Sequence, residues 1–433
     1  MSKLKFSLKL LKLRPYGFIV LSLFAIGVLL RLWGLGNFDI SPDEHHFIHE
    51  AYRYITGDPY IVPRWHAFRH GVPFVGHPFL GGDLIILSFK IFGASVTTGR
   101  LVLVISNIIA IAGTYILART LFGKSVAIAA LAFLVFLPHD VRYGRDAHLD
   151  PLLGATVVWA VFFFWKLLSQ KKIYWGILAG FSAALVMATK INGPFLFAFY
   201  ILATSLYTKI NDLKKLISAH FVQIVLAGLF FIIPFVLLVA PQAYLDALVN
   251  PADPDIDSFS KVISVFMRDS YSMTKRLVIH LYTIPFSILV VIGILKLLGR
   301  RRQEDFFLLS VLAVYAHIFV THSGHSGEYG YITLNPYLSI LAGIALYSLK
   351  PFIRKFVIFI TLLFFLPIMV LHGLRLDVGP FTQLTKFNDS NFRYGQRPYR
   401  DAISAINKIP GSPVVLWVKD GDRHVPIMDV RGG

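Results

Sequence analysis

The residues best suited to chemistry stand in a short polar stretch that directly follows the first long apolar run. Two adjacent carboxylates, Asp43 and Glu44, lie there beside His45 and His46. A carboxylate can serve as general base toward a hydroxyl group, and carboxylate with imidazole can also bind Zn or Mn. Acids just after an apolar run are often ordinary solvated loop residues. The pair therefore gains meaning only from what the rest of the chain brings to it.

Four further polar clusters follow along the chain, and most of them are separated by apolar runs. They are His77-Pro78 and the segments 139–151, 189–193 and 322–331. Three cations in these clusters stand next to apolar runs: Arg142, Arg145 and Lys190. Together they suggest a phosphate held at the depth of lipid headgroups, because the planar fork of arginine binds phosphate through paired hydrogen bonds. The alternative is a set of solvated or snorkelling side chains.

The composition is that of a polytopic membrane protein. Of 433 residues, 56% are hydrophobic and 15% are charged, against about 25% charged in soluble domains. The absence of cysteine excludes disulfides and thiolate metal sites. A basic N-terminus followed by an apolar run is also seen in cleaved signal peptides. No small-residue cleavage site precedes Arg31-Leu32-Trp33, so we expect a retained first span.

Runs of about 20 mostly apolar residues predict transmembrane helices. The sequence contains eleven candidates, near 15–36, 97–118, 125–138, 151–168, 173–190, 194–208, 218–240, 278–298, 306–322, 333–349 and 356–372. The segment 84–92 is too short to span a bilayer, and we expect it to lie in the plane of the membrane surface.

Charges sort by side when the N-terminus is placed in the cytoplasm and the spans alternate. Nearly every inner turn is then basic, and the only acids on the inner side are Asp212, Glu304 and Asp305. This sorting follows the positive-inside rule. It explains much of the net charge of +18 by attraction to the anionic inner leaflet rather than to nucleic acid. All five polar clusters then fall on the outer face.

We therefore expect an all-α polytopic membrane protein with two parts. Residues 1–372 form a transmembrane domain of about eleven helices, whose first outer loop carries in-plane helices. Residues 373–433 form a small α/β domain on the outer face, with a helix over 399–408 and a strand over 413–418. Whether this second domain is complete is left open.

The order of the motifs resembles the GT-C superfamily of glycosyltransferases, specifically the protein O-mannosyltransferase and aminoarabinose transferase branch. The resemblance covers residues 15–372. It rests on the acidic pair after the first span, the His-Pro after that loop, an Arg-x-x-x-x-Asp-Pro loop before the fourth span, Thr-Lys at the end of the fifth, and Tyr-x-x-x-x-Pro entering a late span. One departure concerns the segment from His77 to Gly82, which lacks the second Pro and the Lys of the His-Pro-Pro-Leu-Gly-Lys motif usual in protein mannosyltransferases.

The resemblance implies the GT-C fold and an inverting transferase. Such an enzyme moves a monosaccharide from a polyprenyl or dolichyl phosphate to a hydroxyl acceptor (protein, lipid or glycan). It works on the periplasmic or extracellular face of the plasma or inner membrane. The implied catalytic residues are Asp43, as base, and its neighbour Glu44. The implied donor-phosphate contacts are His77, Arg142, Arg145 and Lys190. Further candidates for substrate contact are His45, His46, Asp146, Glu328, Tyr329 and Tyr331.

The implied partners are the lipid bilayer, the lipid-linked sugar donor and the hydroxyl-bearing acceptor, with no nucleic acid. No cofactor is certain; a divalent metal (Mg, Mn or Zn) is left open, with Glu44 and His77 as candidate ligands. The alternative function is a transporter or flippase of a lipid-linked or polyanionic substrate, which would want ionisable groups at the bilayer midplane. A non-catalytic scaffold gives no reason for five polar clusters on one face. The sequence names neither the sugar nor the acceptor.

Overall fold

The structure is a computed structural model that describes residues 15–36, 41–56, 78, 80–190, 193, 195–207, 278–279, 282–316, 327–370, 374, 417–420 and 423–426. Within these ranges the chain is helical apart from one two-stranded sheet. The elements are α1 (Pro15–Leu32), α2 (Pro42–Ile55), α4 (Leu80–Phe92), α5 (Val96–Phe122), α6 (Lys124–Phe136), α7 (Pro138–Tyr143), α8 (Asp150–Gln170), α9 (Ile173–Thr189), α10 (Phe195–Tyr207), α14 (Ile284–Arg300), α15 (Gln303–Tyr315), the 3-10 helix η4 (Gly327–Thr333), α17 (Asn335–Ser348), α18 (Pro351–Ile368), β1 (Trp417–Asp420) and β2 (Arg423–Pro426).

The predicted spans agree with the helices wherever the structure describes them. Each expected span coincides with a helix except the one near 218–240, which lies outside the described residues. Among the described helices, three are both long and apolar enough to cross a membrane: α5, α8 and α18. Shorter apolar helices accompany them, at Tyr16–Leu32, Lys124–Phe136, Ile173–Thr189 and Phe195–Leu206. The several-span character is confirmed, and the count of eleven stays a prediction.

Local sequence signals account for the ends of the helices. Proline stands in the first turn of α2, α7, α8, α14, α17 and α18, where its missing N–H costs no hydrogen bond. The turn between α5 and α6 is Gly123, with φ of 85°, a left-handed value that glycine adopts without steric cost. Short turns of this kind bring successive helices into antiparallel contact.

Glycine permits close helix packing between α5 and α8 and between α14 and α17. A side chain at Gly113 of α5 would meet Val158 and Trp159 of α8, and one at Gly293 of α14 would meet the backbone of Leu341 in α17. Small residues at such positions let helix backbones approach, which is a common basis of association within membranes. One large buried cluster of apolar side chains extends from α2 to α18.

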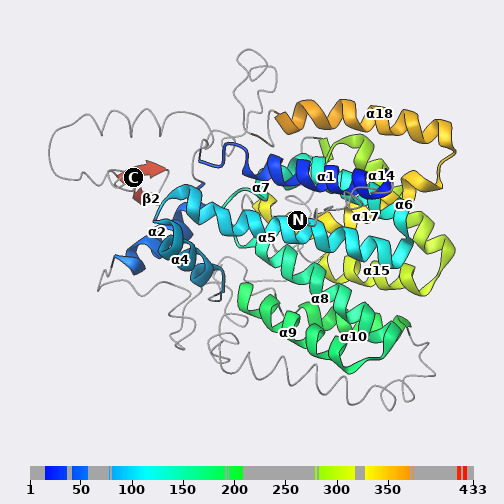
Figure 1. Cartoon of the computed structure of the whole chain (residues 1–433), viewed down its shortest axis with the longest axis horizontal. Coiled ribbons are helices and arrows are strands. Elements are labelled where there is room, and N and C mark those ends of the chain that lie inside the picture. The colour runs from blue at the N-terminus through cyan, green and yellow to red at the C-terminus, as the bar shows by residue number, and fades with distance from the viewer. Residues whose placement is uncertain are drawn as a thin grey trace, which may run out of the picture.

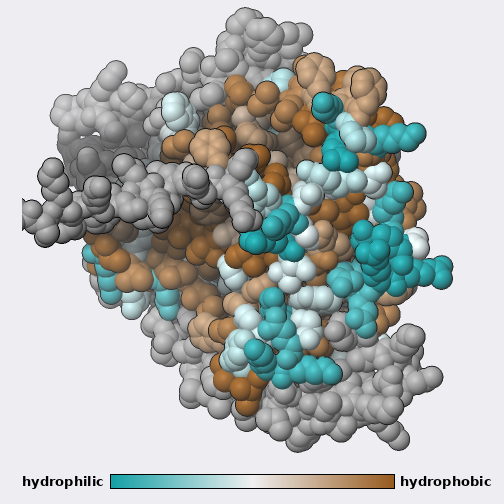
Figure 2. All heavy atoms as spheres, turned by 45° about the vertical axis from the view of Figure 1, so that its right-hand side comes forward, coloured by the Kyte–Doolittle hydropathy of each residue, from teal (hydrophilic) through white to brown (hydrophobic). Residues whose placement is uncertain are grey.

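The two ends of the bundle differ in character. The helices α2 and α4 lie together at one end, on the left of Figure 1. Hydrophilic side chains gather on the opposite end, which Figure 2 brings forward. Exposed cations occupy the short turns there: Lys124 after α5, Lys171 and Lys172 after α8, Arg301 and Arg302 after α14, and Lys350 after α17. The basic turns expected on one side therefore do share one end, and which side of a membrane it faces stays a prediction.

The expectations for the first loop and the tail are met in part. The apolar segment 84–92 belongs to a helix, α4, that begins four residues earlier, and its in-plane placement stays a prediction. In the tail, β1 and β2 pair antiparallel, with Trp417 opposite Pro426. The strand expected over 413–418 overlaps β1 only at its end, and the helix expected over 399–408 lies outside the described residues.

Candidate active site

The first turn of α2 carries the acidic pair and is fixed by a capping box. The Ser41 hydroxyl accepts from the Glu44 N–H at 3.3 Å, and the Ser41 N–H donates to Glu44 Oε2 at 3.2 Å. Pro42 follows the cap, so Asp43 is the second residue of the helix. Carboxylates are favoured there because helix N-terminal N–H groups are unpaired and carry partial positive charge. The Asp43 side chain itself lies outside the described part of the structure, as do those of His45 and His46.

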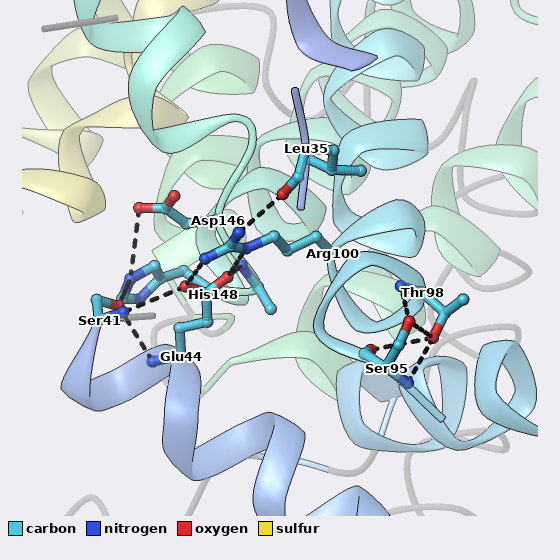
Figure 3. Close-up of polar contacts among 9 residues, drawn as sticks. Leu35, Ser41, Glu44, Ser95, Thr98, Arg100, Asp146 and His148 are labelled. Carbon is cyan, nitrogen blue, oxygen red and sulfur yellow. Dashed lines mark hydrogen bonds and ion pairs between the residues drawn. The ribbon is translucent and has the colours of Figure 1, made fainter. Parts of the chain in front are cut away.

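Glu44 is completely buried and tied to three parts of the chain. Its Oε1 accepts from Arg100 Nε at 2.6 Å and from the Ala147 N–H at 2.8 Å, while Oε2 accepts from Arg100 Nη2 at 2.8 Å. The same arginine donates to the Leu35 carbonyl at 2.8 Å. Figure 3 shows Glu44 and Arg100 reaching each other from α2 and α5. The pair therefore anchors the first turn of α2 to α5 and to the loop after α7.

The protonation equilibrium of Glu44 reflects this setting. Burial by itself raises the pKa of the Glu44 carboxyl, but the charge and hydrogen bonds of Arg100, with the Ala147 N–H, more than compensate and lower the pKa to about 2. An efficient general base has a pKa close to the working pH. These contacts favour an anchoring role for Glu44 and leave Asp43 as the candidate base.

The divalent metal left open by the sequence can be tested against the candidate ligand Glu44. Both Glu44 oxygens already accept hydrogen bonds, and two of these bonds come from the Arg100 guanidinium. Coordination of a metal by Glu44 would therefore break a buried ion pair. Across the described ranges no group of three or more His, Asp or Glu residues could hold a metal ion. Glu44 does not fit a metal ligand, and the other candidate, His77, lies outside the described residues.

The loop between α7 and α8 packs under the first turn of α2. Arg145 is 1% exposed and donates to the Trp33 carbonyl, which holds the turn after α1. Asp146 is buried, with Oδ2 3.9 Å from His148 Nε2. Arg142 places its guanidinium 5.3 Å from the Tyr143 ring. Arg145 was expected to contact the donor phosphate, and one of its guanidinium nitrogens donates to the backbone.

Lys190 lies at the end of α9 and is 5% exposed. Its Nζ donates to Asp150 Oδ1 at 2.7 Å and lies 5.5 Å from the centre of the Tyr329 ring. Tyr329 stacks on the His148 ring at 4.4 Å with 18° between the planes. His148 Nε2 in turn is 3.0 Å from the Ser41 hydroxyl.

These contacts form a continuous chain, which we call the Ser41–Lys190 path and which consists of Ser41, His148, Tyr329, Lys190 and Asp150. It joins residues from α2, the loop before α8, η4 and the end of α9. Four of the five polar clusters recognised in the sequence are therefore in contact at one place. The arrangement puts the acidic turn of α2 at one end and a buried cation at the other.

The remaining expected residues are placed only in part. The start of α4 lies against this site, because a side chain at Gly81 would meet Leu149. His77 itself and the side chain of Glu328 lie outside the described residues. Tyr331 is completely buried in the core cluster, so its ring packs inside the protein rather than lining an open surface.

A second buried polar network, around Asp140, was missed by the sequence analysis. Arg31, at the end of α1, donates to Asp140 Oδ2 at 2.7 Å and to Asn107 Oδ1 at 3.0 Å. Asn335 donates to Asp140 Oδ1 at 2.9 Å and accepts from the Tyr282 hydroxyl at 2.9 Å. The signal was available in the sequence, since an arginine or asparagine within an apolar run requires a buried partner. Arg100 could have been found in the same way.

Comparison with solved structures identifies the fold. ArnT from Cupriavidus metallidurans in the apo state is similar with a TM-score of 0.57 and 20% identity, over 79% of this chain and 62% of that chain. The same protein bound to undecaprenyl phosphate is similar with a TM-score of 0.53 and 18% identity, over 81% of this chain and 63% of that chain. The Archaeoglobus fulgidus oligosaccharyltransferase complex with Zn and sulfate is similar with a TM-score of 0.56 and 17% identity, over 91% of this chain and 56% of that chain. The chain thus shares the fold of these proteins, and it spans less than two thirds of their length.

A family match narrows the resemblance. Residues 76–238 match the family described as dolichyl-phosphate-mannose-protein mannosyltransferase. The resemblance to the GT-C glycosyltransferases, in their protein mannosyltransferase and ArnT branch, is thereby confirmed over that part of the chain. No curated protein matches the chain in sequence.

Proposed function

We propose that this protein is an inverting glycosyltransferase that moves a monosaccharide from a polyprenyl or dolichyl phosphate to a hydroxyl acceptor. The observation that carries the proposal is the Ser41–Lys190 path, which connects the acidic first turn of α2 to a buried lysine through direct contacts. Base and cation on opposite sides of one site are what the reaction needs. The matched family and the undecaprenyl phosphate bound to ArnT support the donor class.

The chemistry assigns separate tasks to the two ends of the path. An acceptor hydroxyl is a weak nucleophile near neutral pH, so Asp43 takes its proton as the oxygen attacks the sugar carbon. The lipid phosphate leaves from the opposite face, and its developing charge is stabilised by cations rather than by a general acid. Lys190 and Arg145 supply that charge, with Arg142 and His77 as further contacts. One displacement of this kind inverts the configuration at the sugar carbon.

Sidedness is part of the proposal. The basic turns gather at the end of the bundle far from α2, and basic turns favour the cytoplasmic side. The site then faces the periplasmic or extracellular side, where a lipid-linked donor and an external acceptor meet. Reporter fusions after Lys172 and after Val378 should report opposite sides, and a shared side would refute this topology.

Asp43→Asn tests the base. The amide is nearly isosteric but cannot take a proton, so transfer should fall about 100- to 10,000-fold while binding of undecaprenyl phosphate is retained. Cells expressing wild type, Asp43→Asn or no protein are compared by mass spectrometry of surface polymers, lipids and glycoproteins. The matched control is Glu50→Gln, which neutralises another acid of the same helix. An Asp43→Asn protein that still transfers sugar at near wild-type rate would refute the assignment.

Lys190→Met tests the phosphate contact. Loss of a charge-assisted hydrogen bond in a buried site costs about 1.5–3 kcal/mol, so undecaprenyl phosphate should bind about 10- to 150-fold more weakly. The control is Lys166→Met. Its Nζ also lies over an aromatic ring, 5.6 Å from the centre of the Phe162 ring, but Lys166 is near the end of α8, whereas Asp150, the partner of Lys190, is at its start. Equal affinity of wild type, Lys190→Met and Arg145→Met for undecaprenyl phosphate would refute the proposal that these two cations contact the donor phosphate. A transport assay on the same samples separates transfer from the flippase alternative.

A further inference from the structure

His148 occupies the middle of the Ser41–Lys190 path and takes no part in the reaction as proposed. It is 3% exposed and stands on the loop between α7 and α8. Figure 3 shows its ring beside Ser41, with Asp146 close by. A histidine buried this deeply beside a carboxylate is held by its surroundings in one orientation.

The ring makes two different contacts in two different directions. Its edge meets α2, because Nε2 lies 3.0 Å from the Ser41 hydroxyl. Its face meets η4, because it stacks on Tyr329 at 4.4 Å with 18° between the planes. The first contact needs a polar nitrogen and the second needs a flat ring, so substitution can remove one and keep the other.

Each contact leads to one end of the site. The Ser41 hydroxyl also accepts from the Glu44 N–H at 3.3 Å and so sets the first turn of the helix that carries Asp43. On the other side, the Tyr329 ring lies 5.5 Å from Lys190 Nζ. A phosphate that binds Lys190 competes with Asp150 and with the Tyr329 ring for the ammonium group. Tyr329 stacks on the imidazole, so a displacement of its ring would be felt directly by His148.

We propose that His148 is a positioning residue that aligns the first turn of α2 with the occupancy of the lipid-phosphate site at Lys190. This inference rests on the proposed function. Its consequence is an ordered reaction, in which Asp43 is brought into line for the acceptor only when the donor is bound. Premature binding of an acceptor hydroxyl at Asp43 is then unproductive.

Two substitutions separate the two contacts. His148→Phe keeps a ring to stack on Tyr329 but has no nitrogen for Ser41, so we expect undecaprenyl phosphate to bind nearly as in wild type and transfer at saturating donor to fall about 3- to 10-fold. His148→Gln keeps a polar group for Ser41 but has no ring to stack on Tyr329, so we expect binding to weaken about 3- to 10-fold. Transfer at saturating donor should also fall, because donor occupancy no longer reaches Ser41, while the melting temperature stays close to that of wild type. A merely structural role would lower both quantities and the melting temperature together in each variant.

A second readout does not depend on transfer. The chain has no cysteine, so Tyr52→Cys on α2, at a position 39% exposed, accepts a single environment-sensitive fluorophore. Titration with undecaprenyl phosphate in nanodiscs should change the fluorescence of labelled protein with His148 intact. In His148→Phe the lipid should still bind, measured separately with radiolabelled lipid, but the fluorescence should no longer respond.

The outcomes distinguish failure of the proposed function from failure of the coupling through His148. If the protein with intact His148 binds neither undecaprenyl phosphate nor dolichyl phosphate, the proposed function fails. If it binds but the label does not respond, or if the His148→Phe protein responds like the parent, the coupling through His148 is overturned and the proposed function stands. Equal loss of binding and transfer in both variants also overturns the coupling.

Discussion

In the described part of the chain, a serine begins both α2 and α5 with the same kind of helix-capping motif. In α2, Ser41 and Glu44 exchange hydrogen bonds between side chain and backbone at 3.3 and 3.2 Å. In α5, Ser95 and Thr98 do the same at 3.2 and 3.0 Å. Both appear in Figure 3. As local structures the two motifs are nearly equivalent, and each satisfies N–H groups that would otherwise be unpaired.

The motifs differ in what their side chains reach beyond the helix end. The α5 motif is exposed, and the Thr98 hydroxyl also bonds the nearby Gly93 carbonyl at 2.7 Å. The α2 motif joins distant segments, because Glu44 binds Arg100 and the Ala147 N–H while Ser41 meets His148. A capping motif thus only begins a helix in α5, whereas in α2 it also forms part of the candidate active site. Four changes test how far that difference goes.

The largest effect is expected from Glu44→Gln. It leaves Arg100 as a buried charge without its carboxylate, and breaking such a pair from one side costs about 3–5 kcal/mol. Thermal unfolding of the purified protein in detergent should show this loss. The combined change Glu44→Leu with Arg100→Met should recover much of it, since no lone charge remains. A Glu44→Gln protein as stable as Thr98→Ala would make the two motifs equivalent after all.

Acid should weaken the α2 motif and leave the α5 motif unchanged. The pKa of Glu44 is lowered from 4.5 to about 2, so its ionised form is stabilised by folding. That stabilisation is complete above pH 4.5 and is lost as the pH falls through 2. The difference in melting temperature between wild type and Glu44→Gln should therefore be constant from pH 5 to 8 and shrink below 4.5. A difference that does not change down to pH 2 would contradict the anchoring role.

Ser41→Ala should combine a small loss of stability with a loss of function. Removal of a serine cap costs about 1 kcal/mol, and the same change removes the hydroxyl that meets His148. Melting temperature should fall by a few degrees, and transfer at saturating donor should fall about as in His148→Phe. The double variant Ser41→Ala with His148→Phe should be no worse in transfer than either single variant, because the two remove one contact.

The smallest effect is expected from Ser95→Ala. Its cap is exposed, so stability should fall by about 1 kcal/mol or less, with no change in transfer or in undecaprenyl phosphate binding. The measurement is the pair of assays used for Ser41→Ala, on protein prepared in parallel. A functional loss as large as that of Ser41→Ala would mean that the capping motif, rather than its contact with His148, matters at both sites.

Much of the architecture was readable in the sequence because membrane helices follow local rules. Long apolar runs gave the expected spans and basic short turns gave their sidedness, and the helices coincide with these spans where the structure describes the chain. The family match over 76–238 agrees with the motifs noted in that region. The motif order also indicated which clusters should meet, and contacts now join Ser41, Lys190 and Tyr329 through His148.

The partners of individual polar residues were not readable. Glu44 and Asp43 are adjacent acids with the same surroundings in sequence, and nothing local indicates that Glu44 is neutralised by an arginine 56 positions away. His148 likewise attracted no role, because one histidine in a polar loop has no pattern. Such pairs depend on where two helices cross, which is set by the packing of many side chains at once.

The sequence by itself indicated a membrane protein and gave the order of its helices. It also separated the basic turns from the polar clusters and pointed to the turn with Asp43 and Glu44 as the candidate catalytic site. The tertiary structure alone decided that Glu44 is bound by Arg100, that Lys190 is paired with Asp150, and that His148 contacts both Ser41 and Tyr329. The physical reason is that hydrophobicity and helix capping act within a few residues. Buried charges, in contrast, are satisfied by whatever partner the fold places within about 3 Å.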